Sequence, residues 1–115
     1  MKPIKALRGN IENIPHLHLH ILLTSEDGVV VARCLDFSVS SHGENEKEAL
    51  VSLSSSIKDY IEYALKHDSA SEIIDPAADE YWDVYKKLEL QDEALRIKEN
   101  ADTLKADRLK EVIYA

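Results

Sequence analysis

Three histidines at alternate positions are the side chains of this sequence whose type and spacing best suit chemistry. His16, His18 and His20 occupy positions i, i+2 and i+4 of a segment that reads as a strand, where alternate residues project to one side. Neutral imidazole is a common zinc ligand. Because each two-residue step spans about 7 Å, three histidines of one straight strand cannot share a tetrahedral ion.

Two of these histidines could bind a metal together with His42 or an acid from elsewhere in the chain. A pH-dependent interface is another use of histidines in this position. The simplest interpretation is that all three are exposed at the start of a strand. We therefore expect no metal site and keep His16, His18 and His20 only as weak candidates.

The other reactive side chains do not form a catalytic constellation. Asp27 reads as a turn residue and Asp36 as a bend between two strands. The serines at 54–56 lack the glycine elbow of a nucleophile, and three glycines in the whole chain leave no phosphate-binding loop. The single cysteine, Cys34, lies in an apolar run typical of a core residue. We expect no enzyme activity and no cofactor.

Composition favours a single domain that binds another protein. The chain has 115 residues, 44% hydrophobic and 31% charged, with a net charge of −8. Neither half has the basic excess that nucleic-acid binding needs, whereas a basic protein is a plausible partner. No signal peptide is visible, and no apolar run approaches the roughly 20 residues that span a bilayer. We expect a cytoplasmic protein without a membrane contact.

The three histidines lie on the first strand of a predicted hairpin. Residues 16–26 alternate in polarity, Asp27-Gly28 is a preferred pair for a two-residue type I′ turn, and residues 29–35 read as the next strand. If Glu26 pairs with Val29, one face carries Leu19, Ile21, Leu23, Val30, Ala32 and Cys34. The opposite face is half apolar, and needs cover from the C-terminal segment or a second subunit at Leu22, Val29, Val31 and Leu35.

One capped helix follows a short strand at Phe37–His42. Asn45 is a good N-cap and Glu48 stands at the capping-box position. The helix is expected to continue to about Lys66, with apolar residues every three or four positions. These are Ala49, Leu50, Leu53, Ile57, Tyr60, Ile61, Ala64 and Leu65. The first 14 residues, in contrast, read as a solvated arm.

The C-terminal segment reads as a second helical unit. Residues 67–74 are a linker, and Asp75 with Pro76 is a typical helix start. Tyr81, Trp82, Tyr85 and Leu88 then form an aromatic stripe for packing. A coiled-coil-like seam of about two heptads follows at Leu90, Ala94, Ile97, Ala101 and Leu104, and requires a partner helix. The tail Glu111–Ala115 is locally strand-like and could add an edge strand.

Two segments resemble the HicB antitoxin family. Asp27-Gly28 with the strand that follows, and the run Gly43-Glu44-Asn45 leading to Glu48-Ala49, resemble that family's turn, second strand and helix entry. The segment around Tyr81-Trp82 is similar to the tail of stand-alone HicB-like proteins. The resemblance implies a partial ribonuclease-H-like fold without its nuclease site, dimers or higher oligomers, and masking of a small basic toxin.

The expected fold is therefore α+β. It has a three- or four-stranded antiparallel sheet, one helix packed on it in the order β-β-β-α, and a C-terminal helical segment; the units are residues 1–74 and 75–115. The expected function is an antitoxin or interaction domain that forms a dimer or tetramer. The alternative is a stand-alone ligand-sensing or scaffold protein. The candidate interface residues are Leu22, Val29, Val31, Leu35, Trp82, Leu90, Ile97 and Leu104.

Overall fold

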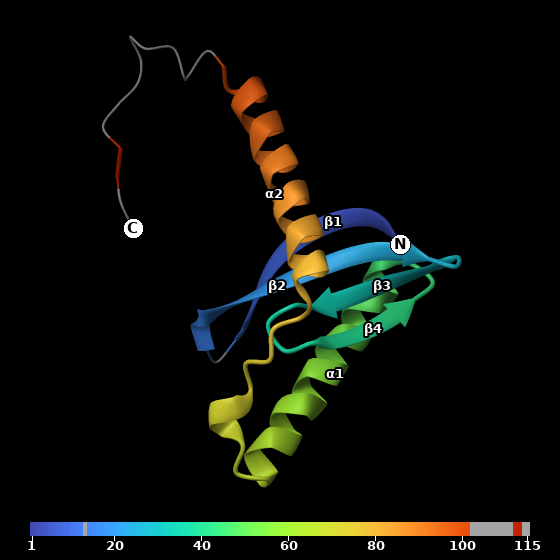
Figure 1. The fold of residues 1–115 in the computed structure, drawn as a ribbon, viewed down its shortest axis with the longest axis vertical. Helices are drawn as coiled ribbons and strands as arrows, with labels where there is room; N and C mark the ends of the chain where they lie inside the picture. Colours follow the sequence, from blue (N-terminus) through green and yellow to red (C-terminus); the bar gives the residue numbers. More distant parts are fainter. Residues whose placement is uncertain (13, 102–111, 114–115) are drawn as a thin grey trace.

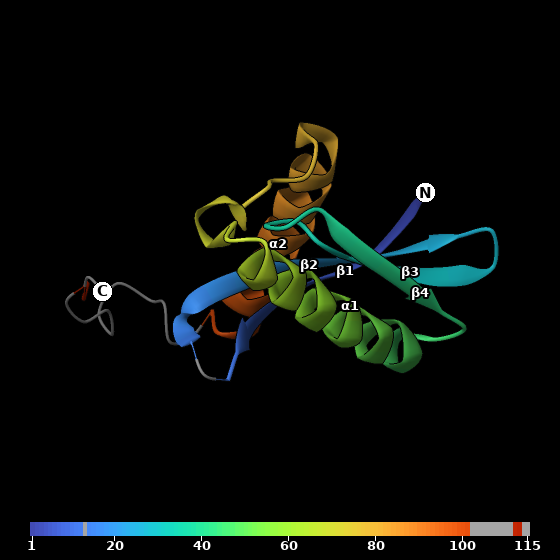
Figure 2. The ribbon, with the colours of Figure 1, turned by 90° about the horizontal axis from the view of Figure 1, so that it is seen from below.

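The protein is an antiparallel sheet with one helix on each face, as the computed structural model shows (Figures 1 and 2). The strands β1 (Lys2–Ile11), β2 (Ile14–Glu26), β3 (Val29–Cys34) and β4 (Val39–Gly43) follow one another across the sheet. They are followed by α1 (Glu46–Lys66), a short 3₁₀ turn η1 (Ala70–Glu72) and α2 (Asp79–Glu99). The structure describes residues 1–12, 14–101 and 112–113. The expected α+β class is confirmed, with four strands before the first helix.

The central hairpin has the predicted register. Asp27 and Gly28 both have positive φ, 50° and 83°, as a type I′ turn requires. Glu26 pairs with Val29 and Ile21 with Cys34. Because strand side chains alternate between faces, this register separates two sets of apolar residues. We call the face that carries Ile21 the first face and the face that carries Leu22 the second face.

The N-terminal residues form a full strand, so the prediction of a solvated arm was wrong. β1 pairs along β2, with Leu7 opposite Ile21 and Arg8 opposite His20. The apolar residues Ile4, Leu7 and Ile11 pack against the core of the first face. Lys5 and Arg8 between them, and Lys2 before them, obscured the apolar pattern in the sequence, and a bulge between Pro3 and Lys5 breaks its alternation.

The first face is covered by α1. Its core combines sheet residues with the buried helix residues Ala49, Leu53 and Ile57. The predicted cap is present: the Asn45 side chain accepts a hydrogen bond from the Glu48 N–H at 2.9 Å. The Glu48 carboxylate accepts one from the backbone N–H of Glu44, one residue before the cap, at 2.8 Å. Most of the expected stripe is buried or half-buried, but Leu65 is 60% exposed and does not belong to it.

The last strand begins later than expected. Phe37 lies in the turn before β4, where it is 1% exposed and its ring stacks on Tyr60 at a centroid distance of 5.6 Å. Ser38 next to it has φ 55°. The chain therefore turns around a buried aromatic side chain, and pairing with β3 starts at Val39 opposite Cys34.

The second helix also begins later than expected, at Asp79 and not at Pro76. The Asp75 N–H donates to the Asp36 carbonyl at 2.9 Å, and the Ala77 N–H donates to the Leu35 carbonyl at 2.8 Å. These hydrogen bonds hold residues 75–77 extended along the end of β3. The helix-start signal in the sequence was overridden by this long-range pairing.

Candidate functional site

The second face of the sheet is covered by the first half of α2. Leu22 and Leu35 are both 0% exposed and form a second cluster with Tyr85, which is 3% exposed. Half-buried residues around them include Tyr81 and Trp82. Of the two sources of cover considered from the sequence, the chain's own C-terminal segment provides it. Leu22 and Leu35 are thus inside the folded chain, and the assignment of these two residues to a partner interface is corrected.

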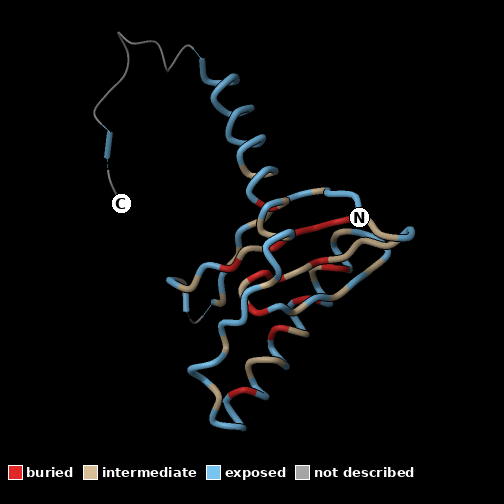
Figure 3. Tube along the Cα trace, viewed as in Figure 1, coloured by how far each residue is buried: buried red, intermediate tan, exposed pale blue. Residues whose placement is uncertain are grey.

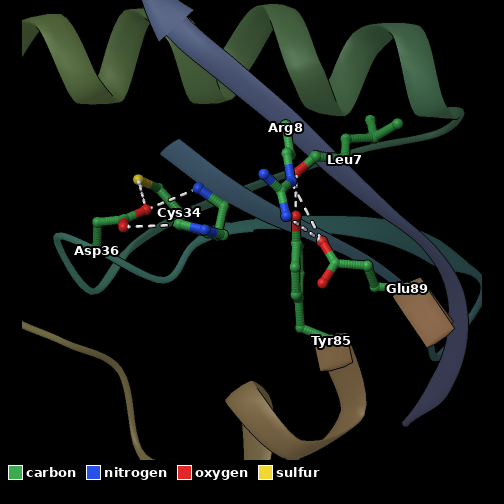
Figure 4. A network of polar contacts seen from close by, with 7 residues as sticks. Leu7, Arg8, Cys34, Asp36, Tyr85 and Glu89 are labelled. Carbon is green, nitrogen blue, oxygen red and sulfur yellow. Dashed lines mark hydrogen bonds and ion pairs between the residues drawn. The ribbon is translucent and has the colours of Figure 1, made fainter. Parts of the chain in front are cut away.

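The Asp36 carboxylate binds His20 where the pairing of β2 with β3 ends (Figure 4). The Asp36 side chain accepts a hydrogen bond from the His20 N–H at 2.7 Å and contacts His20 Nδ1 at 3.0 Å. The imidazole packs at centroid distances of 5.2 Å from Trp82 and 5.4 Å from Tyr85. Asp36 therefore orients the ring beneath α2, and the arrangement anchors the helix to the sheet.

The three histidines separate into two environments. His20 is half-buried in the contact with Asp36, whereas His16 and His18 are exposed. Among residues 1–12, 14–101 and 112–113, no three histidine, cysteine or acidic side chains come together in a way that could hold a metal ion. The structure thus does not bring His16, His18 and His20 to one centre.

The Cys34 thiol also contacts Asp36, at 3.9 Å from the carboxylate oxygen that accepts the His20 N–H (Figure 4). The side chain is 0% exposed. Burial raises the pKa of the thiol to about 11, and the neighbouring Asp36 charge also raises it. A thiol with this pKa is almost entirely protonated at neutral pH, so it is not an activated nucleophile.

Two polar contacts join α2 to β1 (Figure 4). The Tyr85 hydroxyl donates to the Leu7 carbonyl at 3.0 Å. The Arg8 guanidinium donates to one oxygen of Glu89 from two nitrogens, at 3.2 and 2.8 Å. Their partners are about 80 positions apart in the sequence, so no local signal could have revealed them.

The Arg33 side chain also holds the start of α2 against the sheet. Arg33 lies 4.6 Å from the centroid of the Tyr81 ring. It donates to Thr24 Oγ1 at 2.9 Å and pairs with the Glu26 carboxylate at 2.9 Å. Partial burial alone would raise the pKa of Glu26, but the hydrogen bonds from Arg33 and Thr24 outweigh it and lower that pKa. Arg33 and Glu26 thus help to position this end of the helix.

The second half of α2 extends beyond the sheet, and its residues are exposed (Figures 1 and 3). Leu90, Leu95 and Ile97 are 55%, 53% and 60% exposed. Asp92 and Arg96 form an ion pair within the helix at 2.9 Å. Leu90 and Ile97 of the predicted seam therefore lie on an open surface, whereas Leu104 lies outside the described residues.

Val29 and Val31 lie on the part of the second face that α2 leaves uncovered. Both are half-buried and line a shallow hollow together with Ser40 and His42 of β4. A neighbouring hollow extends from Ser40 to the start of α2. These two valines, unlike Leu22 and Leu35, remain available to a partner.

Trp82 has a role different from the one expected at sequence level. It is half-buried, and its ring packs against His20 and lies at a centroid distance of 6.4 Å from the Tyr85 ring. Trp82 therefore belongs to the contact between α2 and the sheet within the chain. Its assignment to a partner interface is corrected accordingly.

In the described part of the chain no helix is long and apolar enough to cross a membrane. Comparisons with protein-family models, curated proteins and solved structures find no match to this chain.

Proposed function

We propose that this chain is a non-catalytic interaction protein that binds and masks a small basic protein, in the manner of the HicB-like antitoxins that its sequence resembles. The observation that carries the proposal is the uncovered part of the second face at Val29 and Val31, which lies near the exposed acidic start of α2. An uncovered apolar surface bordered by charged residues is typical of a protein-binding site.

The engagement of the reactive groups supports a non-catalytic role. His20 is in contact with Asp36, Arg33 with Glu26, and the Cys34 thiol is buried and protonated. Within the described residues, every buried side-chain nitrogen or oxygen has a hydrogen-bond partner. Contacts of this kind also occur in structural hydrogen-bond and ion-pair networks, so they fit a non-catalytic role.

Charge supports a basic partner. The chain has 22 acidic and 14 basic residues. Three acidic side chains, Asp79, Glu80 and Asp83, are exposed where α2 begins. Opposite charge steers association and increases its rate. A single buried thiol needs no oxidising compartment, which fits the cytoplasm as the place of action.

Co-expression tests this proposal. The probe is the product of a short adjacent reading frame that encodes a basic protein, and the expected results are co-purification and relief of its growth arrest. Reversing Asp79, Glu80 and Asp83 to lysine should weaken the complex, whereas reversing three other exposed acids, Asp59, Glu62 and Glu72, is the matched control. Absence of both co-purification and relief would contradict the proposal.

The alternative is a stand-alone oligomeric scaffold or ligand-sensing protein without a toxin partner. The specific observation in its favour is the seam on the open half of α2, because Leu90 and Ile97 can be covered by another α2 helix without any second protein. A stable oligomer together with no basic partner in the co-expression experiment would favour this alternative.

A further inference from the structure

The seam of α2 faces away from the sheet. At 3.6 residues per turn, Leu90, Ala94, Ile97 and Ala101 lie roughly 120–180° around the helix from the docked Tyr85. All four are exposed. A second helix placed against them would therefore lie on the side of α2 opposite the sheet, where the chain's own strands do not obstruct it (Figure 1).

The charges beside the seam identify its occupant. With Leu90 and Ile97 at heptad position d and Ala94 at position a, Glu93 falls at position g and Lys98 at position e. In a parallel pair of helices, each g residue faces the e residue five positions later on the other helix. Glu93 then faces Lys98 of the second helix, and the two-fold axis repeats this ion pair on the other side.

We propose, building on the interaction role above, that the second half of α2 forms a parallel two-stranded contact with α2 of a second copy of this chain. One acidic and one basic flank on the same surface are self-complementary, as a two-fold interface requires. A uniformly basic partner would find Lys98 repulsive. Among the described residues neither Glu93 nor Lys98 forms an ion pair, whereas Asp92 is already paired with Arg96.

The antiparallel arrangement lacks these ion pairs. If two antiparallel helices overlap the same seam residues, g positions face g positions and e positions face e positions. Glu93 then lies beside Asn100 of the second copy, and Lys98 lies beside Gln91. The charge pattern thus selects the parallel orientation, and both sheets lie at the same end of the dimer.

The contact begins at Leu90. One heptad earlier, the d and a positions are occupied by Asp83 and Lys87, and a parallel pair would bring each of these charges against its own copy. The apolar seam from Leu90 to Ala101 is about 17 Å long at 1.5 Å per residue. A contact of this size is small, so we expect a dimer that dissociates on dilution into the micromolar range.

Sedimentation equilibrium of the purified full chain from about 1 µM to 1 mM tests the proposal. We expect a monomer–dimer equilibrium that Leu90→Asp with Ile97→Asp abolishes. Since both residues are exposed, circular dichroism should show that this variant remains folded. Glu93→Lys or Lys98→Glu alone should weaken the dimer about tenfold, and the two together should restore it. Glu99→Lys, the same charge change at a position away from the seam, is the matched control.

Crosslinking reports the orientation. In a parallel pair the two copies of residue 90 face each other, whereas in the antiparallel pair they lie about 16 Å apart along the axis. Leu90→Cys in a Cys34→Ala background should therefore oxidise to a disulfide-linked dimer. A dimer without this disulfide overturns the parallel arrangement, and a monomer at every concentration overturns the dimer. Because the experiment contains no basic protein, either result leaves the co-expression test of partner binding unaffected.

Discussion

The two halves of α2 lie in opposite environments. Both halves contain apolar residues at helical spacing among many charges. In the first half Tyr85 is 3% exposed against the sheet, whereas in the second half Ile97 is 60% exposed. The first half, which we call the docked half, contains aromatic side chains with polar tips. The second half, which we call the open half, contains aliphatic side chains at heptad spacing. The comparison indicates that the first half stabilises the fold and the second half is available for binding.

The largest expected difference between the halves concerns apolar burial. Tyr85→Ala removes a buried ring and its hydrogen bond to Leu7, so we expect a loss of about 3 kcal/mol in the free energy of unfolding. Leu95→Ala, in the open half and away from the seam, should change it by about 0.5 kcal/mol or less. Urea unfolding measures both. Equal losses would show that the open half is also packed.

The second largest difference in stability is expected between two carboxylates, Asp36 at the docking contact and Asp92 in the open half. Asp36→Ala leaves the part-buried N–H of His20 without its acceptor, and should lower the free energy of unfolding by about 2 kcal/mol. Asp92→Ala removes only a solvated ion pair of the open half, and should cost about 0.5 kcal/mol or less. Thermal unfolding distinguishes the two variants. A neutral Asp36→Ala variant would contradict the anchoring role of this residue.

Alkaline pH should weaken the packing of α2 on the sheet. Burial raises the pKa of Tyr85 above its ordinary value near 10. Its contribution to stability is therefore complete below that value, and is lost as the pH rises through the higher pKa of the folded state. The only tryptophan, Trp82, lies in the docked half, so its fluorescence should shift to longer wavelength as the helix leaves the sheet. Tyr85→Phe should reduce this pH dependence. The raised pKa of Cys34 contributes to the pH dependence equally in both proteins.

The smallest effect is expected for the surface ion pairs. Arg8→Ala breaks a contact between β1 and the docked half, whereas Arg96→Ala breaks one within the open half. Both arginines are largely exposed, so screening reduces both effects. Arg8→Ala should lower the melting temperature slightly more at low salt, and the difference should vanish at high salt. A difference that persists at high salt would show that Arg8 acts through packing.

Local signals in the sequence predicted the local structure. The Asp27-Gly28 turn fixed the pairing of Ile21 with Cys34, because positive φ at two successive residues specifies the hairpin register. The cap at Asn45 placed the start of α1 correctly, since its hydrogen bonds lie within four residues. These elements depend on neighbours in sequence, so one sequence is sufficient to find them.

Long-range contacts account for what was missed. β1 is stabilised by pairing with a strand whose partner residues lie up to 23 positions away, and its own pattern is masked by Lys2, Lys5 and Arg8. The start of α2 was displaced by the hydrogen bonds of Asp75 and Ala77 to the end of β3. The half-apolar second face was recognised correctly as a surface in need of cover, but the choice between helix and partner depends on tertiary packing.

The cover of the second face is the last element of the described fold to be synthesised. The four strands and α1 are complete at Lys66, whereas the ring of Tyr85 that closes over Leu22 and Leu35 arrives 19 residues later. During translation the new sheet therefore exposes an apolar face to other nascent chains. A message that ends before α2 would yield a protein with this face permanently open, and such a fragment would be a substrate for chaperones and proteases.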